Sequence, residues 1–145
     1  MTSVLVTGAG GVIGTGLCKY LESKPHDVLG IDLDNPEFDH DVPVENHDLR
    51  SNSALPEVDV IVHLAAHSRV PPVLDEPSLA FENIALLEPV LEHAHRTDAH
   101  VVFASSREVY GNAIGADEKD ISTEQPNPYG ASKLAGEALV NAYNK

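Results

Sequence analysis

The amino-acid sequence predicts a single α/β domain over residues 1–145, built on a doubly wound parallel sheet. Short apolar runs typical of buried strands alternate with longer stretches of helical periodicity, which is the pattern of a parallel sheet with crossover helices. The first apolar run leads directly into a glycine-rich turn and a helix start. The apolar fraction of 42% is ordinary for a globular protein of this length.

The first half of the chain predicts four strands and one helix. The expected strands cover residues 4–6, 28–31, 42–44 and 58–66, and the expected helix covers residues 12–21. The helix ends before Pro25. The segment 33–43 is rich in Asp, Asn and Pro and predicts a loop, so the 42–44 strand is weak. The run 58–66 is almost continuously apolar, as expected of a central strand covered on both faces.

The second half of the chain predicts a loop, two helices and one more strand. The Pro71–Pro72 pair marks the loop. A helix is expected from Glu76 or Pro77 to His95, with its apolar residues largely on one side and a kink at Pro89. The remaining elements are a strand over 101–104, a polar loop over 111–128 and a helix over 129–143.

Three glycines dominate the turn after the first strand. Gly8 permits the turn, Gly11 lets the backbone approach a ligand, and Gly14 lets the helix pack close to the strand. Such a turn gathers backbone N–H groups and the positive end of a helix dipole, where a pyrophosphate can bind. The alternative is an ordinary strand-to-helix turn. The preceding strand and following helix favour dinucleotide binding.

Two acidic residues follow later strands and predict how a dinucleotide is held. Asp32 ends the second strand, 18 residues after Gly14, where a carboxylate can accept hydrogen bonds from both ribose hydroxyls of NAD. It would repel the 2′-phosphate of NADP, and no arginine lies between it and Arg50, so NAD is preferred. Asp48 either faces the adenine amino group or caps a short helix near Ser51.

The charge is unusual for a protein of this size. The chain has 23 Asp and Glu residues against 9 Lys and Arg residues, a formal net charge of −14. Such a surface repels nucleic-acid backbones, which excludes a general role in binding them. Scattered acids with few lysines indicate adaptation to high salt, where self-repulsion is screened; a moderately acidic mesophilic protein is the alternative.

The cysteine content, the length of the apolar runs and the histidines bear on the cellular compartment and on metal binding. The single cysteine, Cys18, cannot form an internal disulfide and is expected to be a buried apolar residue in a reducing, cytoplasmic compartment. No apolar run approaches the roughly 20 residues of a membrane span, and the N-terminus leaves no room for a signal peptide. His63 and His67 lack the cysteine or acid cluster that a metal site needs.

A tyrosine and a lysine open the last helix and predict acid–base chemistry. Tyr129 and Lys133 are four residues apart and therefore share one helix face. A nearby ammonium stabilises phenolate, so we expect the pKa of Tyr129 to fall from its usual value of about 10 towards neutrality. That makes Tyr129 a usable general base or acid, and Lys133 could also hold a ribose.

Taken together, these residues resemble the extended short-chain dehydrogenase/reductases, the NAD-dependent epimerase/dehydratase group that acts on nucleotide sugars and has a Rossmann fold. The resemblance covers the whole chain. The matching stretches are Thr7–Gly14, Asp32, Asp48–Leu49, His63–Ala66, Asn83, Ser105–Gly111 and Pro126–Lys133.

The resemblance implies a role for each matching residue. Ser106 would hydrogen-bond the sugar hydroxyl that is oxidised, Tyr129 would take its proton as hydride passes to NAD, and Lys133 would orient the nicotinamide ribose. The implied cofactor-binding residues are Gly8, Gly11, Val12, Ile13, Gly14, Asp32, Asp48, Leu49, Leu64, Ala65, Ala66, Asn83, Tyr129 and Lys133.

The loop before Tyr110 helps to choose among reactions. The 4,6-dehydratases that this chain resembles carry an Asp-Glu pair there, whereas this chain has Arg107-Glu108. Arginine cannot act as an acid at ordinary pH, so a dehydratase is disfavoured. Decarboxylases of UDP-glucuronate resemble this loop too, with a single glutamate. A 4-epimerase acting on a UDP-hexose is the preferred function, by resemblance alone.

One departure from the family concerns length. Members continue past the tyrosine–lysine helix with more strands and a smaller C-terminal substrate domain, whereas this chain stops at Lys145. We therefore expect an N-terminal fragment, inactive alone, with an exposed apolar sheet edge. The resemblance also implies a homodimer through helices 76–95 and 129–145. The alternative functions are a non-catalytic NAD-binding module and a domain whose glycine turn is merely architectural.

Overall fold

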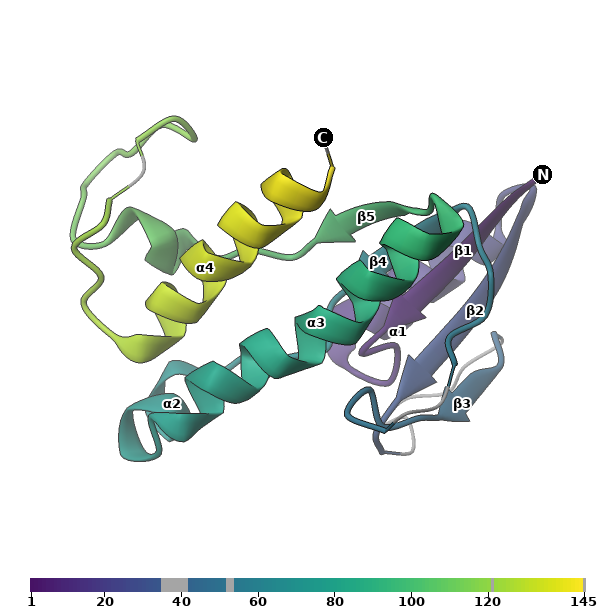
Figure 1. Cartoon of the computed structure of the whole chain (residues 1–145), viewed down its shortest axis with the longest axis horizontal. Helices are drawn as coiled ribbons and strands as arrows, with labels where there is room; N and C mark the ends of the chain where they lie inside the picture. Colours follow the sequence, from purple (N-terminus) through teal and green to yellow (C-terminus); the bar gives the residue numbers. More distant parts are fainter. Residues whose placement is uncertain (35–41, 52–53, 121, 145) are drawn as a thin grey trace.

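The computed structural model describes residues 1–34, 42–51, 54–120 and 122–144 of the chain. The strands are β1 (Thr2–Thr7), β2 (His26–Asp32), β3 (Val44–Asn46), β4 (Val60–His63) and β5 (His100–Phe103). The helices are α1 (Val12–Glu22), α2 (Val70–Asp75), α3 (Ser78–Thr97) and α4 (Pro128–Tyr143), with a short 3-10 helix η1 (Arg107–Tyr110). Figure 1 shows these elements along the chain.

All five strands form one parallel sheet in the order β3-β2-β1-β4-β5. The order reverses at β1, because the chain moves first to β2 and β3 and then returns to the other side of β1 for β4 and β5. A crevice opens at such a switch point beside the carboxyl ends of the strands, which is where ligands bind in folds of this kind. The predicted doubly wound sheet is confirmed.

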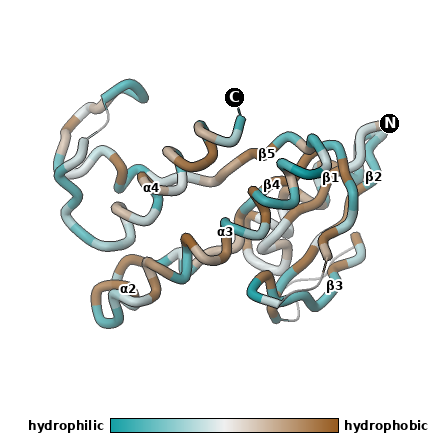
Figure 2. Tube along the Cα trace, in the orientation of Figure 1, coloured by the Kyte–Doolittle hydropathy of each residue, from teal (hydrophilic) through white to brown (hydrophobic). Residues whose placement is uncertain are grey.

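Helices cover both faces of the sheet and form a hydrophobic core on each. Successive side chains of β1 point alternately into these two cores. Leu5 faces a core formed with α3 and α4, whereas Val4 and Val6 face a core with Cys18 of α1. Hydrophobic residues mark the central strands in Figure 2. A strand buried on both faces is apolar throughout, which explains the continuous apolar run of β1.

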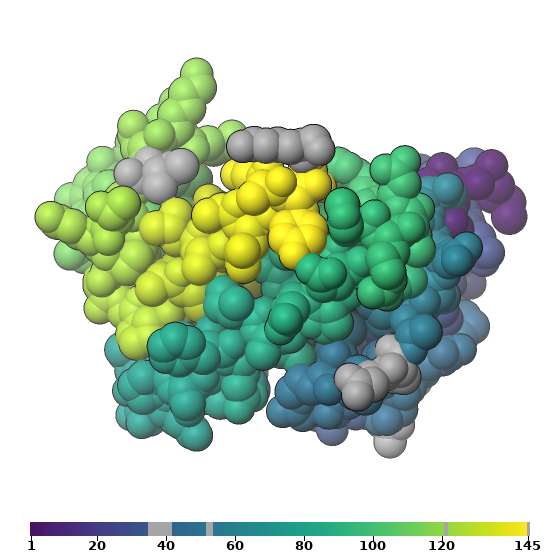
Figure 3. Space-filling model, viewed as in Figure 1, coloured from purple at the N-terminus to yellow at the C-terminus, as the bar shows by residue number. Residues whose placement is uncertain are grey.

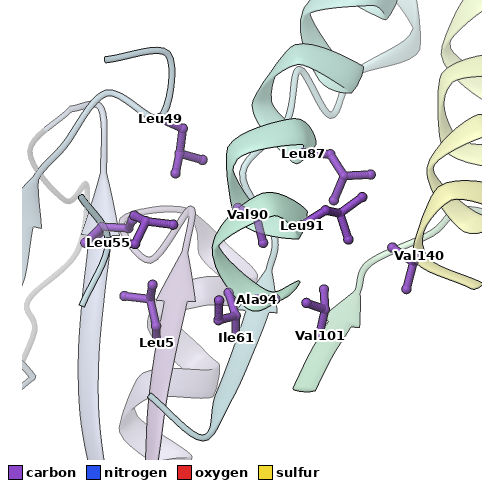
Figure 4. Packing of buried hydrophobic residues seen from close by; sticks show 11 residues of the cluster. Leu5, Leu49, Leu55, Ile61, Leu87, Val90, Leu91, Ala94, Val101 and Val140 are labelled. Atoms are coloured by element: carbon purple, nitrogen blue, oxygen red, sulfur yellow. The ribbon is translucent and has the colours of Figure 1, made fainter. Parts of the chain in front are cut away.

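The larger core holds the sheet against α3 and α4, which lie side by side in Figure 3. Figure 4 shows Leu5 and Ile61 of the sheet beneath Leu87, Val90 and other α3 side chains. Leu5, Ile61 and Leu87 are fully buried. Each such side chain stabilises the fold by about 1.5–3 kcal/mol relative to an exposed one, so this core fixes the strand ends that carry the site.

Several element boundaries differ from those predicted. Residues 70–75 form the helix α2 where the Pro71–Pro72 pair predicted a loop. This prediction was wrong because both prolines occupy the first turn of α2, where the missing N–H groups are not needed. β3 begins at Val44, although a strand was expected over 42–44, and β4 ends at His63 rather than Ala66.

Two other expectations concern α3 and the loop before β3. The helix α3 runs for 20 residues and continues through Pro89. The loop expected over 33–43 lies largely outside the described residues. Among the residues that the structure describes, no helix is both long and apolar enough to cross a membrane.

Candidate active site

A cavity of about 660 Å³ lies at the carboxyl ends of the strands and extends to the start of α4. It is lined by segments that follow all five strands, although these are far apart in the sequence. Most residues predicted to bind a cofactor line it. They are Gly8, Gly11, Val12, Ile13, Gly14, Asp32, Asp48, Leu49, Leu64, Ala65, Ala66, Tyr129 and Lys133. Asn83 and Ser106 are not among its lining residues in the described part of the chain.

The glycine turn has no space for side chains at two of its glycines. Gly8 has a φ of +71°, and a Cβ there would lie 2.7 Å from the Ala65 backbone nitrogen. A Cβ at Gly14 would lie 2.2 Å from the Gly8 carbonyl oxygen. At Gly11 the nearest atom is 3.5 Å from such a Cβ, and the residue is exposed. The turn therefore packs tightly on its inner side and presents its Gly11 backbone to the cavity.

Asp32 joins the end of β2 to this turn. One of its carboxylate oxygens accepts the Gly10 N–H at 2.8 Å, and the other accepts the Leu33 N–H at 2.7 Å. The Asp34 N–H also donates to the second oxygen, at 3.4 Å. Two carboxylate oxygens offer about four acceptor positions, so about one remains for a further donor. The carboxylate is thus held in place and can still accept a hydrogen bond from a ligand.

Asp48 forms a close ion pair that the sequence did not reveal. Its carboxylate accepts from the Arg50 Nε at 2.9 Å and the Arg50 Nη2 at 3.0 Å, and these hydrogen bonds hold the pKa of Asp48 below its usual value. It also accepts the Arg50 backbone N–H, so it caps a turn at the position where a short helix was expected. Arg50 Nη1 lies 3.7 Å from Glu82, and Glu82 contacts His67 at 2.9 Å.

The end of β4 supports the floor of the cavity. His63 is buried, and its Nδ1 lies 2.8 Å from the Thr7 hydroxyl, which accepts the Ala65 N–H. Burial, helped by the nearby Lys133 charge, lowers the pKa of His63 to about 3. The neutral imidazole of His63 therefore joins β4 to β1 through the Thr7 hydroxyl, which also contacts Ala65.

Tyr129 and Lys133 occupy the first turns of α4 and are both buried. Lys133 Nζ donates to the Ala104 carbonyl at 2.9 Å and lies 5.9 Å from the centroid of the Tyr129 ring. It also lies 4.9 Å from the Phe103 ring centroid. Burial lowers the pKa of Lys133 to about 8. The cavity therefore contains a phenol beside a desolvated cation.

Ser106 and Asn83 instead make structural contacts, Ser106 within its own segment and Asn83 between segments. The Ser106 hydroxyl accepts the Glu108 N–H at 3.2 Å and caps η1, whereas the neighbouring Ser105 lines the cavity. Asn83 accepts the His67 N–H at 2.8 Å and donates to the Ser132 hydroxyl at 3.3 Å, so it joins the segment after β4 to α4.

Several residues that line the cavity were not predicted to do so, among them Ser105, Arg50, Glu82 and His67. Ser105 was available as the other half of a serine pair. Arg50, Glu82 and His67 gave no such signal. Arg50 and Glu82 resemble ordinary surface charges in the sequence, and the partners of Glu82 are distant from it along the chain.

Comparison with known proteins gives a consistent family assignment. The model of the NAD dependent epimerase/dehydratase family matches residues 4–145. An uncharacterized UDP-glucose epimerase, YtcB of Bacillus subtilis, is 36% identical over 98% of this chain and 52% of its own length. UDP-glucuronate 4-epimerase 2 of Arabidopsis thaliana is 31% identical over 98% of this chain and 38% of its own length.

Solved structures agree with these relatives. A crystal structure of UDP-galactose 4-epimerase has a TM-score of 0.87 and 32% identity, over 97% of this chain and 51% of that protein. MoeE5 in complex with UDP-glucuronic acid and NAD has a TM-score of 0.87 and 31% identity, over 97% of this chain and 49% of that protein. The chain spans about half the length of these proteins.

Proposed function

The chain belongs to the NAD dependent epimerase/dehydratase family, and on that premise we propose that it carries the NAD site and the catalytic side chains of a nucleotide-sugar 4-epimerase. One observation carries the proposal. Tyr129 and Lys133 line the same cavity as the glycine turn and Asp32, although more than 90 residues separate them in the sequence. A domain that only bound a dinucleotide would not need a phenol and a buried cation there.

The residues of the cavity fit NAD. The glycine turn and the start of α1 line the cavity where a diphosphate would bind, although the Gly11 N–H itself donates to the Gly8 carbonyl at 3.3 Å, and Asp32 keeps acceptor capacity for a ribose hydroxyl. The negative charge of Asp32 would repel the 2′-phosphate of NADP. Arg50, which lines the same cavity, is already paired with Asp48 and lies near Glu82, so it does not offset that repulsion.

When bound, NAD supplies a hydride acceptor and donor at its nicotinamide ring. The chain supplies the proton transfer. Tyr129, in its phenolate form, takes the proton of the sugar hydroxyl, and the Lys133 cation stabilises that phenolate before the transfer. With a pKa of about 8, Lys133 remains mostly protonated at neutral pH. The Ser106 hydroxyl accepts from Glu108 and keeps its own proton to donate to the sugar oxygen.

The proposed substrate is a UDP-hexose or UDP-hexuronate that is inverted at C4. Similarity to a UDP-glucose epimerase, to UDP-glucuronate 4-epimerases and to UDP-galactose 4-epimerase supports this class. A dehydratase or decarboxylase is the second candidate, because Glu108 precedes Tyr110 as it does in those enzymes. The contacts of Glu108 weigh against that candidate, since its carboxylate is bound by Asn127 and Arg107.

The proposal has a direct test. Calorimetry should detect NAD binding that Asp32→Ala weakens and that NADP does not match; equal affinities for NAD and NADP would contradict the role of Asp32. In the protein expressed from the whole gene, Tyr129→Phe should slow interconversion of the C4 epimers by about 10²–10⁴-fold. Tyr143→Phe, at the exposed far end of the same helix, is the matched control. Full turnover in the Tyr129 variant would refute the catalytic assignment.

We also propose a homodimer through the exposed sides of α3 and α4, in a cytoplasm of high salt. Phe81 of α3 is 79% exposed, and the net charge is −14. Sedimentation at low and high KCl concentrations tests both properties. A monomer at every salt concentration would contradict the dimer, and loss of folded structure in high salt would contradict the salt adaptation.

A further inference from the structure

We propose that Glu108 is a positioning residue, which fixes the first turn of α4, and hence Tyr129, relative to Ser106. This inference rests on the proposed function, because it concerns the groups assigned there to proton transfer. It differs from the role that a glutamate at this position would have as the acid or base of a dehydratase.

The Glu108 side chain bridges two segments. One carboxylate oxygen accepts the side-chain amide of Asn127 at 2.7 Å, and the other accepts Arg107 Nη1 at 3.3 Å. The side chain is 22% exposed. Asn127 is 19 positions away in the sequence, so the 2.7 Å hydrogen bond is a tertiary link between η1 and the start of α4.

The bridge is linked at one end to Ser106 and at the other end to the first turn of α4, which carries Tyr129. The backbone N–H of Glu108 donates to the Ser106 hydroxyl at 3.2 Å. The Asn127 side-chain oxygen Oδ1 accepts the Gly130 N–H at 2.8 Å and caps α4. Tyr129 lies between these two capping partners. The path Ser106–Glu108–Asn127–Gly130 therefore determines how far the serine hydroxyl lies from the tyrosine.

Close backbone packing makes this path stiff. A Cβ on Gly130 would lie 3.1 Å from the Glu108 carbonyl oxygen and 2.6 Å from Gln125 Oε1. Gln125 in turn donates to the Val109 carbonyl at 3.0 Å. Because α4 contacts η1 through backbone atoms, a displacement of Glu108 moves the first turn of α4.

The carboxylate is directed to this bridge rather than to the cavity. Glu108, like Ser106, is not among the lining residues in the part of the chain that the structure describes, whereas Tyr129 and Lys133 are, so its contacts and not its position beside the cavity set its role. An acid or base must reach its proton directly or through one water. Because its carboxylate accepts from Asn127 and Arg107, we assign Glu108 an indirect role, through Tyr129 and Ser106.

A set of variants separates positioning from acid–base chemistry. Glu108→Gln keeps an oxygen that can accept from Asn127 but cannot act as a base, whereas Glu108→Ala removes the acceptor. Asn127→Asp keeps the helix cap but places two carboxylates together. In the double variant E108Q/N127D, the new amide can donate to the new carboxylate and restore the bridge.

The first readout is hydrogen exchange at the Gly130 amide in the chain. We expect Glu108→Ala and Asn127→Asp to accelerate this exchange by about tenfold, and Glu108→Gln and the double variant to stay near wild type. This readout does not depend on the proposed function. If Tyr129→Phe shows that function to be wrong, the exchange pattern still tests the bridge.

The second readout is turnover of C4 epimers by the whole protein. Glu108→Ala should lower kcat by about 10²-fold with little change in KM, since a misplaced group slows chemistry more than binding. Glu108→Gln should retain most of kcat. If Gln and Ala variants lose turnover equally while Gly130 exchange is unchanged in both, Glu108 is an acid or base and the inference is overturned. A double variant no better than Asn127→Asp would also overturn it.

Discussion

Replacing Gly14 by alanine would place a methyl group where the structure has no space. The new Cβ would lie 2.2 Å from the Gly8 carbonyl oxygen and 2.7 Å from the Ala9 Cα. Both contacts are with backbone, which cannot move aside as the end of a side chain can. The turn and the start of α1 must separate, and this is the same turn that we propose binds a diphosphate.

The size of the effect follows from two opposing contributions. Overpacking typically costs about 1–3 kcal/mol, and backbone contacts this short favour the upper end. Alanine gains about 1 kcal/mol over glycine in helix propensity. The net loss in free energy of unfolding is about 2 kcal/mol, which lowers the melting temperature of a domain this size by about 4–8 °C.

Gly16 provides the matched control on the same helix. A Cβ at Gly16 meets no atom within 4 Å, so Gly16→Ala gains the helix propensity without a clash. It should raise the melting temperature by about 2–4 °C. Thermal unfolding followed by circular dichroism measures both variants. If the two variants melt at the same temperature, the packing argument for Gly14 is refuted.

Three further predictions concern buried titratable groups. Burial lowers the pKa of Lys133 from 10.5 to about 8, so its contribution to the free energy of unfolding rises with pH across that window, by at most about 1.4 kcal/mol per pH unit. Urea titrations should show a shallower rise for Lys133→Met; an unchanged slope would contradict the burial argument. Burial lowers the pKa of His63 from 6.5 to about 3, so the stability it contributes is complete above pH 6.5 and is lost as the pH falls. His63→Gln should therefore reduce acid sensitivity, whereas the exposed control His100→Gln should not. Burial, with a smaller effect of Glu22, raises the pKa of the Cys18 thiol to about 11. Iodoacetamide at pH 8 should modify it only in urea, and equal rates in the native protein would contradict its burial.

The sequence predicts the sheet well, because its central strands are buried on both faces and read as apolar runs. β3 gives a weaker signal. Its register pairs Gly30 with Val44 and Asp32 with Asn46, and its exposed polar residues Glu45 and Asn46 carry no apolar pattern. Only pairing with β2 fixes its position, which a local pattern cannot show.

In the candidate site, too, the features set by local spacing could be predicted from the sequence, whereas those set by tertiary packing could not. Spacing indicates the glycine turn, Asp32 and the Tyr129–Lys133 pair, because each depends on local geometry. The contacts of Asn83 depend on packing between distant segments, whereas Ser106 caps the short helix that follows it. The resemblance places both residues in the site, whereas in the structure Asn83 joins segments that surround the site and Ser106 caps η1 beside it.

The most direct test of the account is a crystal structure of the protein grown with NAD. We expect the diphosphate at the glycine turn, a ribose on Asp32, and the nicotinamide ring beside Tyr129 and Lys133. An accessible cavity that remains empty, or a dinucleotide bound with its nicotinamide ring away from Tyr129, would contradict the account.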